Sequence, residues 1–253
     1  MPYVNSQDVR IHYKVEGAGP PLVLLHGFSD SLESWYEHGY VEALKPDYQV
    51  ILLDARGHGA SDKPHDPDAY EMSRTVADIL AVLDALQAPT AHFFGYSMGG
   101  RIGFALAQHA PTRFASLIIG GADPYQRALA ERDEWLSMLR RGMATFVRAW
   151  EQQAPISPAL RARLLATDAE AMIASRIKSM EHPSFAEVLP TMAMPCLVFA
   201  GEADGRYAGV KAGVVHMPNA TLVSLPCLNH AEVFFRSDLV LPHVTKFLAT
   251  VPI

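Results

Sequence analysis

The sequence predicts an α/β fold: a doubly wound, mostly parallel sheet with an inserted helical cap. Uninterrupted apolar runs at Leu22 to Leu25 and Val50 to Leu53 indicate strands buried on both faces, and Ala115 to Ile119 is expected to be another strand. Stretches of helical periodicity separate these runs, so we expect helices on both sides of a parallel sheet. The length of 253 residues and the hydrophobic content of 49% suit one large domain, or a domain with an insertion.

The N-terminal strands are expected to form an antiparallel hairpin. Val9 to Val15 alternates between apolar and polar residues, as an edge strand does, and Tyr3 to Asn5 is its expected partner. One helix is expected from Leu32 to Leu44. A second is expected from Met72 to Leu86, with apolar residues on one face and Ser73 in the N-cap region, where a hydroxyl can accept a hydrogen bond.

A Gly-x-Ser-x-Gly pentapeptide lies at Gly95 to Gly99, between an apolar run and a helical stretch that ends near His109. This order predicts a strand, a sharp turn and a helix. A serine at the tip of such a turn has a strained backbone that exposes its hydroxyl. The backbone two residues before Ser97 passes close to the backbone two residues after it, so glycine fits at both positions. The turn also directs the N–H of Met98 towards the reacting centre.

The alternation of strands and helices stops at Asp123, and from there to about Pro190 we expect only helices. This divides the chain into a core of residues 1–122 and 191–253 and a helical cap of residues 123–190. The helices are expected at Gln126 to Arg141, Ala144 to Gln153, Pro158 to Leu165 and Ala169 to Met180. Most large apolar residues of the cap are expected to pack against one another inside the cap, and the others are expected to line an apolar substrate cleft. The residues assigned to this cleft are Trp135, Met138, Phe146 and Trp150.

The sheet resumes at Cys196 to Ala200 and ends with Ala220 to Leu225. A short helix is expected between these strands, and a closing helix at Val233 to Leu248. Cys196 and Cys227 fall at the start of one strand and just past the end of its neighbour, which is too far apart for a disulfide. Two unpaired cysteines fit a reducing compartment.

Polar side chains follow the predicted parallel strands at the points where the strands end. In such sheets the ligand binds outside the carboxyl ends of the strands. Ser97, Asp204 and His230 each lie just beyond a strand, in that order along the chain. Ester hydrolysis by a serine needs a base beside the hydroxyl, a group that orients the base, and donors for the oxyanion. The other polar residues that follow strands are His26, Asp54 and Asp123.

These motifs resemble the α/β-hydrolase superfamily over nearly the full length of the chain. The matching segments are His26-Gly27-Phe28, Asp54-x-Arg56-Gly57-x-Gly59-x-Ser61, Gly95 to Gly100, Gly201 to Asp204, and Asn229-His230. The resemblance implies that Ser97 is the nucleophile, that His230 is the general base and then the general acid, and that Asp204 orients the imidazole. It also implies that the backbone N–H groups of Phe28 and Met98 bind the oxyanion. Ser97 would attack a carbonyl, the alcohol would leave, and water would cleave the acyl-enzyme.

The choice of the acid stays open, because Asp123 also follows a strand and some relatives carry their acid there. The Gly-Glu-x-Asp turn matches the commoner pattern and favours Asp204, and Glu202 is a third choice. His26 is expected to hydrogen-bond the backbone and to shape its turn. The remaining polar residues of the motifs are also expected to brace loops, namely Asp54, Arg56 and His58.

The site favours a carboxylesterase or lactonase for a small to medium, partly apolar substrate. Haloalkane dehalogenases and epoxide hydrolases of this fold use an aspartate nucleophile, so Ser97 argues against both. Carbon–carbon bond hydrolases have a similar elbow but often carry a tryptophan where this chain has Ala231, and they stay an alternative. Enol-lactone hydrolases have a similar Ser-Met-Gly-Gly elbow and a similar length. A ligand-binding receptor of the same fold with little turnover is the second alternative.

Composition argues against several other classes of protein. The net charge of −6 gives no basic surface for nucleic acid. No apolar signal core begins the sequence and no run is long enough to span a bilayer, so a cytoplasmic protein without a membrane partner is expected. The sequence has no metal-ligand cluster and no Gly-x-Gly-x-x-Gly after a strand, so we expect no metal and no cofactor. The oligomeric state stays open.

Overall fold

The computed structural model describes residues 2–126, 129–152 and 154–253, and within them eight strands form one sheet in the order β1-β2-β4-β3-β5-β6-β7-β8. The strands are β1 (Tyr3–Ser6), β2 (Val9–Glu16), β3 (Pro21–Leu25), β4 (Gln49–Leu53), β5 (Ala91–Tyr96), β6 (Phe114–Gly120), β7 (Cys196–Gly201) and β8 (Ala220–Leu225). β2 runs antiparallel to β1 and to β4, and all other neighbours run parallel. The predicted hairpin and the doubly wound, mostly parallel sheet are therefore confirmed.

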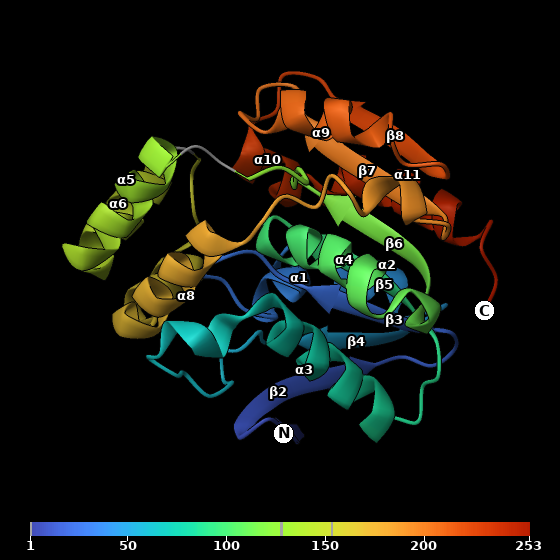
Figure 1. Cartoon of the computed structure of the whole chain (residues 1–253), viewed down its shortest axis with the longest axis horizontal. Coiled ribbons are helices and arrows are strands. Elements are labelled where there is room, and N and C mark those ends of the chain that lie inside the picture. Colours follow the sequence, from blue (N-terminus) through green and yellow to red (C-terminus); the bar gives the residue numbers. More distant parts are fainter. Residues whose placement is uncertain (1, 127–128, 153) are drawn as a thin grey trace.

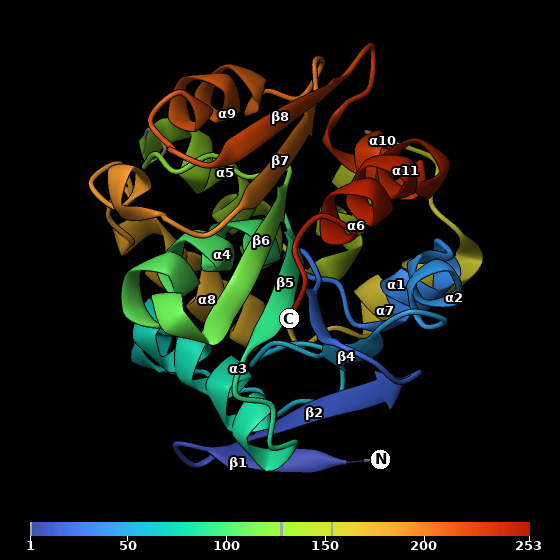
Figure 2. The same ribbon diagram turned by 90° about the vertical axis from the view of Figure 1, so that its right-hand side faces the viewer.

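Helices cover both faces of this sheet (Figure 2). One face carries α3 (Met72–Ala85), α4 (Met98–His109) and α9 (Tyr207–Val214), and the other carries α1 (Glu33–Glu37), α2 (Tyr40–Leu44), α10 (His230–Phe235) and α11 (Ser237–Leu248). Val23 and Leu25 of β3 join the first apolar layer, while Leu22 and Leu24 join the second. Because both layers are buried, most positions of the central strands are apolar, which explains the continuous runs. The buried polar exceptions, His92 of β5 and Ser116 of β6, lie 2.8 Å apart between Nδ1 and Oγ.

Two predicted helices are each divided, and one predicted cap is wrong. The helix expected at 32–44 breaks at Gly39, whose φ of 77° lies in the left-handed region that favours glycine. The closing helix breaks at Arg236, whose ψ of 57° is not helical. The chain enters α3 from an extended conformation at Glu71, so Ser73 already lies in the first turn and does not cap the helix.

The helical insertion, α5 to α8, lies between β6 and β7. Its members are α5 (Leu129–Arg140), α6 (Met143–Glu151), α7 (Pro158–Ala166) and α8 (Ala169–Glu181). These helices share an apolar cluster of their own, and Figure 1 shows α5, α6 and α8 beyond one end of the sheet. The parts of the predicted helices at 127–128 and 153 lie outside the described residues. A separate cap domain with limits at 123 and 190 stays a prediction.

Both cysteines carry free thiols. Cys196 is buried at the start of β7, and Cys227 is exposed after the end of β8. Among the described residues, no helix combines the length and the apolar character needed to cross a membrane.

Candidate active site

Ser97 occupies the single residue between β5 and α4. Its φ of 55° and ψ of −107° form a conformation that L-residues rarely adopt. A Cβ atom on Gly95 would lie 2.2 Å from the carbonyl oxygen of Gly99, and a Cβ atom on Gly99 would lie 2.1 Å from that of Leu25. The close approach of β3, β5 and α4 therefore requires both glycines. The predicted strand, sharp turn and helix are present.

His230 reaches Ser97 from the first position of α10, directly after the connection from β8. The side chain of Asn229 accepts the N–H of Glu232 at 3.0 Å, and the Glu232 carboxylate accepts the N–H of Asn229 at 2.8 Å. This capping box starts α10 at His230. The Tyr96 hydroxyl also donates to the His230 carbonyl oxygen at 2.5 Å. With its backbone held in this way, His230 has its Nε2 2.9 Å from the Oγ of Ser97.

Asp204 lies on the other side of the imidazole. Its Oδ2 is 2.6 Å from Nδ1 of His230, and its Oδ1 accepts the N–H of Arg206 at 2.9 Å. Burial favours the neutral acid, but the hydrogen bond and charge of His230 outweigh it and, with the Arg206 contacts, hold the pKa of Asp204 below its usual value. An ionised carboxylate only accepts hydrogen bonds, so Nδ1 carries the proton and Nε2 is left to accept the hydroxyl of Ser97.

The two alternative acids make other contacts. Asp123 follows β6, and its Oδ1 accepts the N–H of Tyr125 at 3.0 Å. Glu202 is exposed on the surface. The geometry therefore favours Asp204 as the partner of His230.

The segment after β3 crosses the N-terminus of α4 beside Ser97. The carbonyl oxygen of His26 accepts the N–H of Gly99 at 3.2 Å, and Phe28 and Met98 both line one cavity. The ring of His26 shapes this segment as expected, with Nδ1 2.7 Å from the carbonyl oxygen of Gly27 and Nε2 accepting the N–H of Ala55 at 3.1 Å. Both residues of the expected oxyanion pair thus line the same cavity as Ser97, and the oxyanion role of their N–H groups stays a prediction.

The loop after β4 is braced by buried polar residues. Asp54 accepts two main-chain N–H groups at 2.9 Å and lies 2.7 Å from Nδ1 of His12. Burial opposes ionisation of Asp54, but nearby His26 and these hydrogen bonds outweigh it, so its pKa is lowered. Arg56 forms a buried ion pair with Asp78 at 2.6 Å. Burial lowers the pKa of His58, whose Nδ1 lies 2.9 Å from the Arg56 carbonyl oxygen, to about 3. These placements match the bracing roles expected for all three loop residues.

Two cavities meet at Ser97, and both are lined by Phe28, Arg176 and Arg206. The first, here called the Arg101 lobe, has a volume of about 150 Å³. The second, the Trp150 lobe, has a volume of about 330 Å³. The Arg101 lobe is further lined by Met98, Arg101, Asp123, Ser175, Ser179 and His182. The Trp150 lobe is further lined by Trp135, Trp150, Leu160, Leu164, His230 and Phe235.

Two of the four cleft residues predicted from the sequence line a lobe. Trp135 and Trp150 line the Trp150 lobe. Phe146 has no exposed surface, and its ring packs behind the lobe, with centroids 6.2 Å from Phe28 and 5.3 Å from Trp135. Met138 is half-buried and is not among the described lining residues of either lobe. Phe146 points into the apolar cluster of the insertion because that cluster, rather than the cleft, takes the buried face of α6.

Two arginines at the junction of the lobes were not predicted. Nη1 of Arg206 lies 3.1 Å from Nδ1 and 3.2 Å from Nε2 of His230, so the guanidinium lies over the face of the imidazole. Because Arg206 lies only two residues after Asp204, in the same loop, its sequence position could have indicated that it lies near the site. Arg176 comes from α8, and no motif or periodicity in the sequence distinguishes it from a surface arginine.

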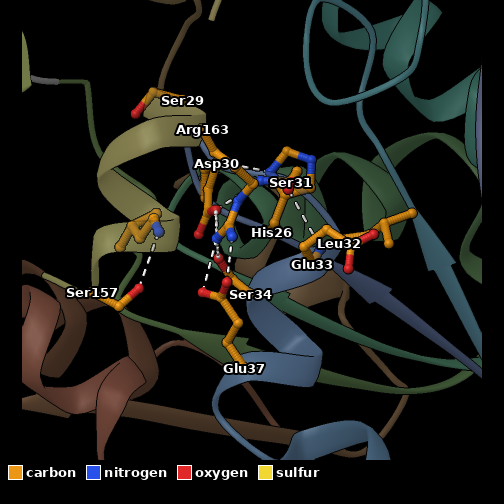
Figure 3. Close-up of polar contacts among 12 residues, drawn as sticks. His26, Ser29, Asp30, Ser31, Leu32, Glu33, Ser34, Glu37, Ser157 and Arg163 are labelled. Atoms are coloured by element: carbon orange, nitrogen blue, oxygen red, sulfur yellow. Dashed lines mark hydrogen bonds and ion pairs between the residues drawn. The ribbon is translucent and has the colours of Figure 1, made fainter. Parts of the chain in front are cut away.

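Arg163 fastens the helical insertion to the core beside the Trp150 lobe. Figure 3 shows its guanidinium reaching from α7 between Asp30 and Glu37. Nη2 lies 3.0 Å from Oε2 of Glu37, 3.1 Å from Oγ of Ser34 and 3.7 Å from Oδ1 of Asp30. Because Asp30 also lines the Trp150 lobe, this contact fixes the position of the insertion relative to the cavity.

Comparison with known proteins agrees with this architecture. A model of the alpha/beta hydrolase fold matches residues 20–192. The putative 2-succinyl-6-hydroxy-2,4-cyclohexadiene-1-carboxylate synthase of Bacillus subtilis is 27% identical over 95% of this chain and 96% of its own. The 3-oxoadipate enol-lactonase 2 of Acinetobacter baylyi is 32% identical over 79% of this chain and 78% of its own. Among solved structures, the enol-lactonase from Burkholderia xenovorans LB400 is 25% identical, has a TM-score of 0.88, and matches over 98% of this chain and 100% of its own.

Proposed function

The chain belongs to the α/β-hydrolase fold family, and on that premise we propose that it is a serine hydrolase that cleaves a carboxylic ester or lactone. The proposal is carried by one row of contacts, from Asp204 Oδ2 to His230 Nδ1 at 2.6 Å and from His230 Nε2 to Ser97 Oγ at 2.9 Å. These distances suit proton transfer from the hydroxyl to the imidazole. The similarity to two enol-lactonases supports an ester-type bond, and the tryptophans that line the Trp150 lobe support a partly apolar substrate of small to medium size.

The reaction proceeds through an acyl-enzyme. Ser97 attacks the carbonyl carbon while His230 takes its proton, and the Asp204 carboxylate stabilises the resulting imidazolium. The N–H groups of Phe28 and Met98 bind the oxyanion, aided by the positive end of the α4 dipole. His230 then protonates the leaving alcohol. Water, deprotonated by the same imidazole, cleaves the acyl-enzyme and restores the Ser97 hydroxyl.

Hydrolysis of p-nitrophenyl butyrate by wild type and by Ser97→Ala tests this proposal. Loss of the nucleophile is expected to lower kcat/KM by several orders of magnitude. Ser73→Ala, which removes an exposed hydroxyl on α3, is the matched control and should keep wild-type turnover. A fluorophosphonate should label the wild type at Ser97 with one equivalent.

Two outcomes would count against an esterase. A Ser97→Ala variant within tenfold of wild type would remove Ser97 from the mechanism. Tight binding of a small molecule without turnover on a broad panel of esters and lactones would favour the receptor alternative. Rapid cleavage of a 1,3-diketone, with esters left intact, would favour the carbon–carbon bond hydrolase.

A further inference from the structure

His58, which lines the Arg101 lobe, carries a buried nitrogen without a hydrogen-bond partner. The side chain lies in the loop after β4 and is only 1% exposed. Its Nδ1 lies 2.9 Å from the carbonyl oxygen of Arg56, whereas its Nε2 is buried and has no hydrogen-bond partner among the described residues. The two rings beside His58 cannot supply that partner, because His26 uses both of its nitrogens in other hydrogen bonds and Phe28 has no donor.

The protonation state of His58 makes this nitrogen a hydrogen-bond acceptor. A carbonyl oxygen only accepts hydrogen bonds, so Nδ1 of His58 carries a proton and donates to the carbonyl oxygen of Arg56. Burial lowers the pKa of His58 to about 3, and the ring is therefore uncharged at physiological pH. In an uncharged imidazole that is protonated at Nδ1, Nε2 can only accept. A buried acceptor without a partner carries a cost in free energy, which a ligand that donates a hydrogen bond removes.

Other polar side chains of the Arg101 lobe suit the same kind of ligand. Nε2 of His182, which follows α8 and lines the lobe, is also buried and has no partner among the residues that the structure describes. Ser175 and Ser179 line the lobe from α8, and their hydroxyls can both donate and accept hydrogen bonds. A ligand group that makes hydrogen bonds therefore fits this lobe better than a purely apolar chain does.

The position of His230 assigns the two halves of an ester to the two lobes. In acyl transfer the histidine that takes the proton from the serine later gives it to the leaving group, so the leaving group must lie on the side of the histidine. His230 lines the Trp150 lobe and is not among the described lining residues of the Arg101 lobe. The leaving alcohol therefore faces the Trp150 lobe, and the rest of the acyl group extends into the Arg101 lobe.

We propose that the acyl part of the substrate carries a hydroxyl group, which lies in the Arg101 lobe and donates a hydrogen bond to Nε2 of His58. The hydroxyl is preferred over a methyl group of similar size, because only the hydroxyl gives the buried nitrogen a partner. This inference rests on the proposed serine hydrolase activity and specifies its substrate class as esters whose acid part bears a hydroxyl group.

Pairs of benzyl esters that differ only by a hydroxyl or a methyl group test this inference. Benzyl 2-, 3- and 4-hydroxybutanoate are compared with benzyl 2-methylbutanoate, 3-methylbutanoate and pentanoate, respectively. Each kcat/KM is divided by the rate constant for alkaline hydrolysis of the same ester, which removes the inductive effect of the hydroxyl, and a blank without enzyme corrects for spontaneous lactonisation. At the position that reaches His58, the normalised kcat/KM of the hydroxy ester should exceed that of its methyl analogue by about tenfold.

Substitution of the two histidines identifies the partner of the hydroxyl group. His58→Phe keeps a planar ring but removes Nε2, so the preference for the hydroxy ester should disappear. His182→Phe makes the same change at the other histidine of the lobe and should keep the preference. Circular dichroism verifies folding, because His58 also braces its loop through Arg56. The wild-type comparison stands by itself if His58→Phe does not fold.

Three outcomes would overturn the proposal. Equal normalised rates within every pair in the wild type would refute the hydroxyl group. A preference that is lost in His182→Phe but kept in His58→Phe would refute the assignment to His58. If no ester is cleaved, the proposed activity fails for these compounds, and calorimetry with the same esters on the Ser97→Ala protein decides the question of the hydroxyl alone. At least one hydroxy ester should then bind about tenfold more tightly than its methyl analogue, and equal affinities in all pairs would sink the inference.

Discussion

Replacing Asp204 by asparagine tests the arrangement of the site most directly. In the proposed mechanism, attack by Ser97 turns His230 into an imidazolium. The Nδ1 of His230 lies 2.6 Å from Oδ2 of Asp204, whose side chain is only 3% exposed. For charge centres about 4 Å apart, at an effective dielectric constant of about 20, the attraction is about 4 kcal/mol. Asparagine keeps the shape but not the charge. Its amide can also donate to Nδ1 and so favour the tautomer that protonates Nε2, which cannot accept the serine proton.

A loss of about 4 kcal/mol of transition-state stabilisation corresponds to a fall in kcat of about 10³-fold. The assay is steady-state hydrolysis of an ester by Asp204→Asn at neutral pH, with circular dichroism to verify folding. Asp123→Asn is the matched control, because Asp123 also follows a strand but accepts the N–H of Tyr125. Its kcat should stay within about fivefold of wild type. The reasoning fails if Asp204→Asn keeps a third of the wild-type kcat, or if Asp123→Asn loses as much.

Two further predictions concern the insertion and the braced loop. Arg163→Met should expose α7 to proteolysis and, in a double-mutant cycle with Glu37→Gln, should show a coupling energy of about 1 kcal/mol. Arg161→Met is the control, because its partner Glu151 belongs to the insertion itself, and it should leave the rate of proteolytic cleavage unchanged. Equal cleavage of the two variants would contradict the role given to Arg163. The pKa of His58 is about 3 in the folded protein and 6.5 ordinarily, so below pH 6.5 the unfolded chain takes up a proton that the folded chain refuses, and stability falls as the pH drops. Between pH 7 and pH 5 the free energy of unfolding should fall by about 2 kcal/mol from this group. In urea unfolding, His58→Gln should show a correspondingly smaller dependence of that free energy on pH, and an unchanged dependence would refute the contribution assigned to His58.

The elements of the core could be predicted from the sequence because their signals are local. A strand buried on both faces is mostly apolar, so Leu22 to Leu25 and Val50 to Leu53 were recognisable without any knowledge of their neighbours. The glycines around Ser97 were equally informative, since the close approach of three elements leaves no space for a Cβ atom. Ser97 and His230 were predicted as partners, and they lie in contact across 133 residues of sequence.

Features that depend on tertiary packing could not be predicted in the same way. The break at Gly39 needs a left-handed residue, but a glycine inside an apolar pattern is also compatible with a continuous helix. Phe146 and Trp150 lie in the same helix and are both large and aromatic, yet the first is fully buried in the cluster and the second lines a lobe. Which face of α6 meets the cavity is decided by its contact with α5 and α7, and composition carries no information on that contact.

The place where the helical insertion joins the sheet has a consequence for how this protein can change. β6 and β7 pair directly, with Leu117 opposite Cys196, so the ladder of main-chain hydrogen bonds does not pass through the four helices between them. Ser97, Asp204 and His230 all come from segments outside those helices. A different set of helices could thus be inserted at this junction, by recombination or by design, to change which molecules are bound while the three proposed catalytic residues stay in place.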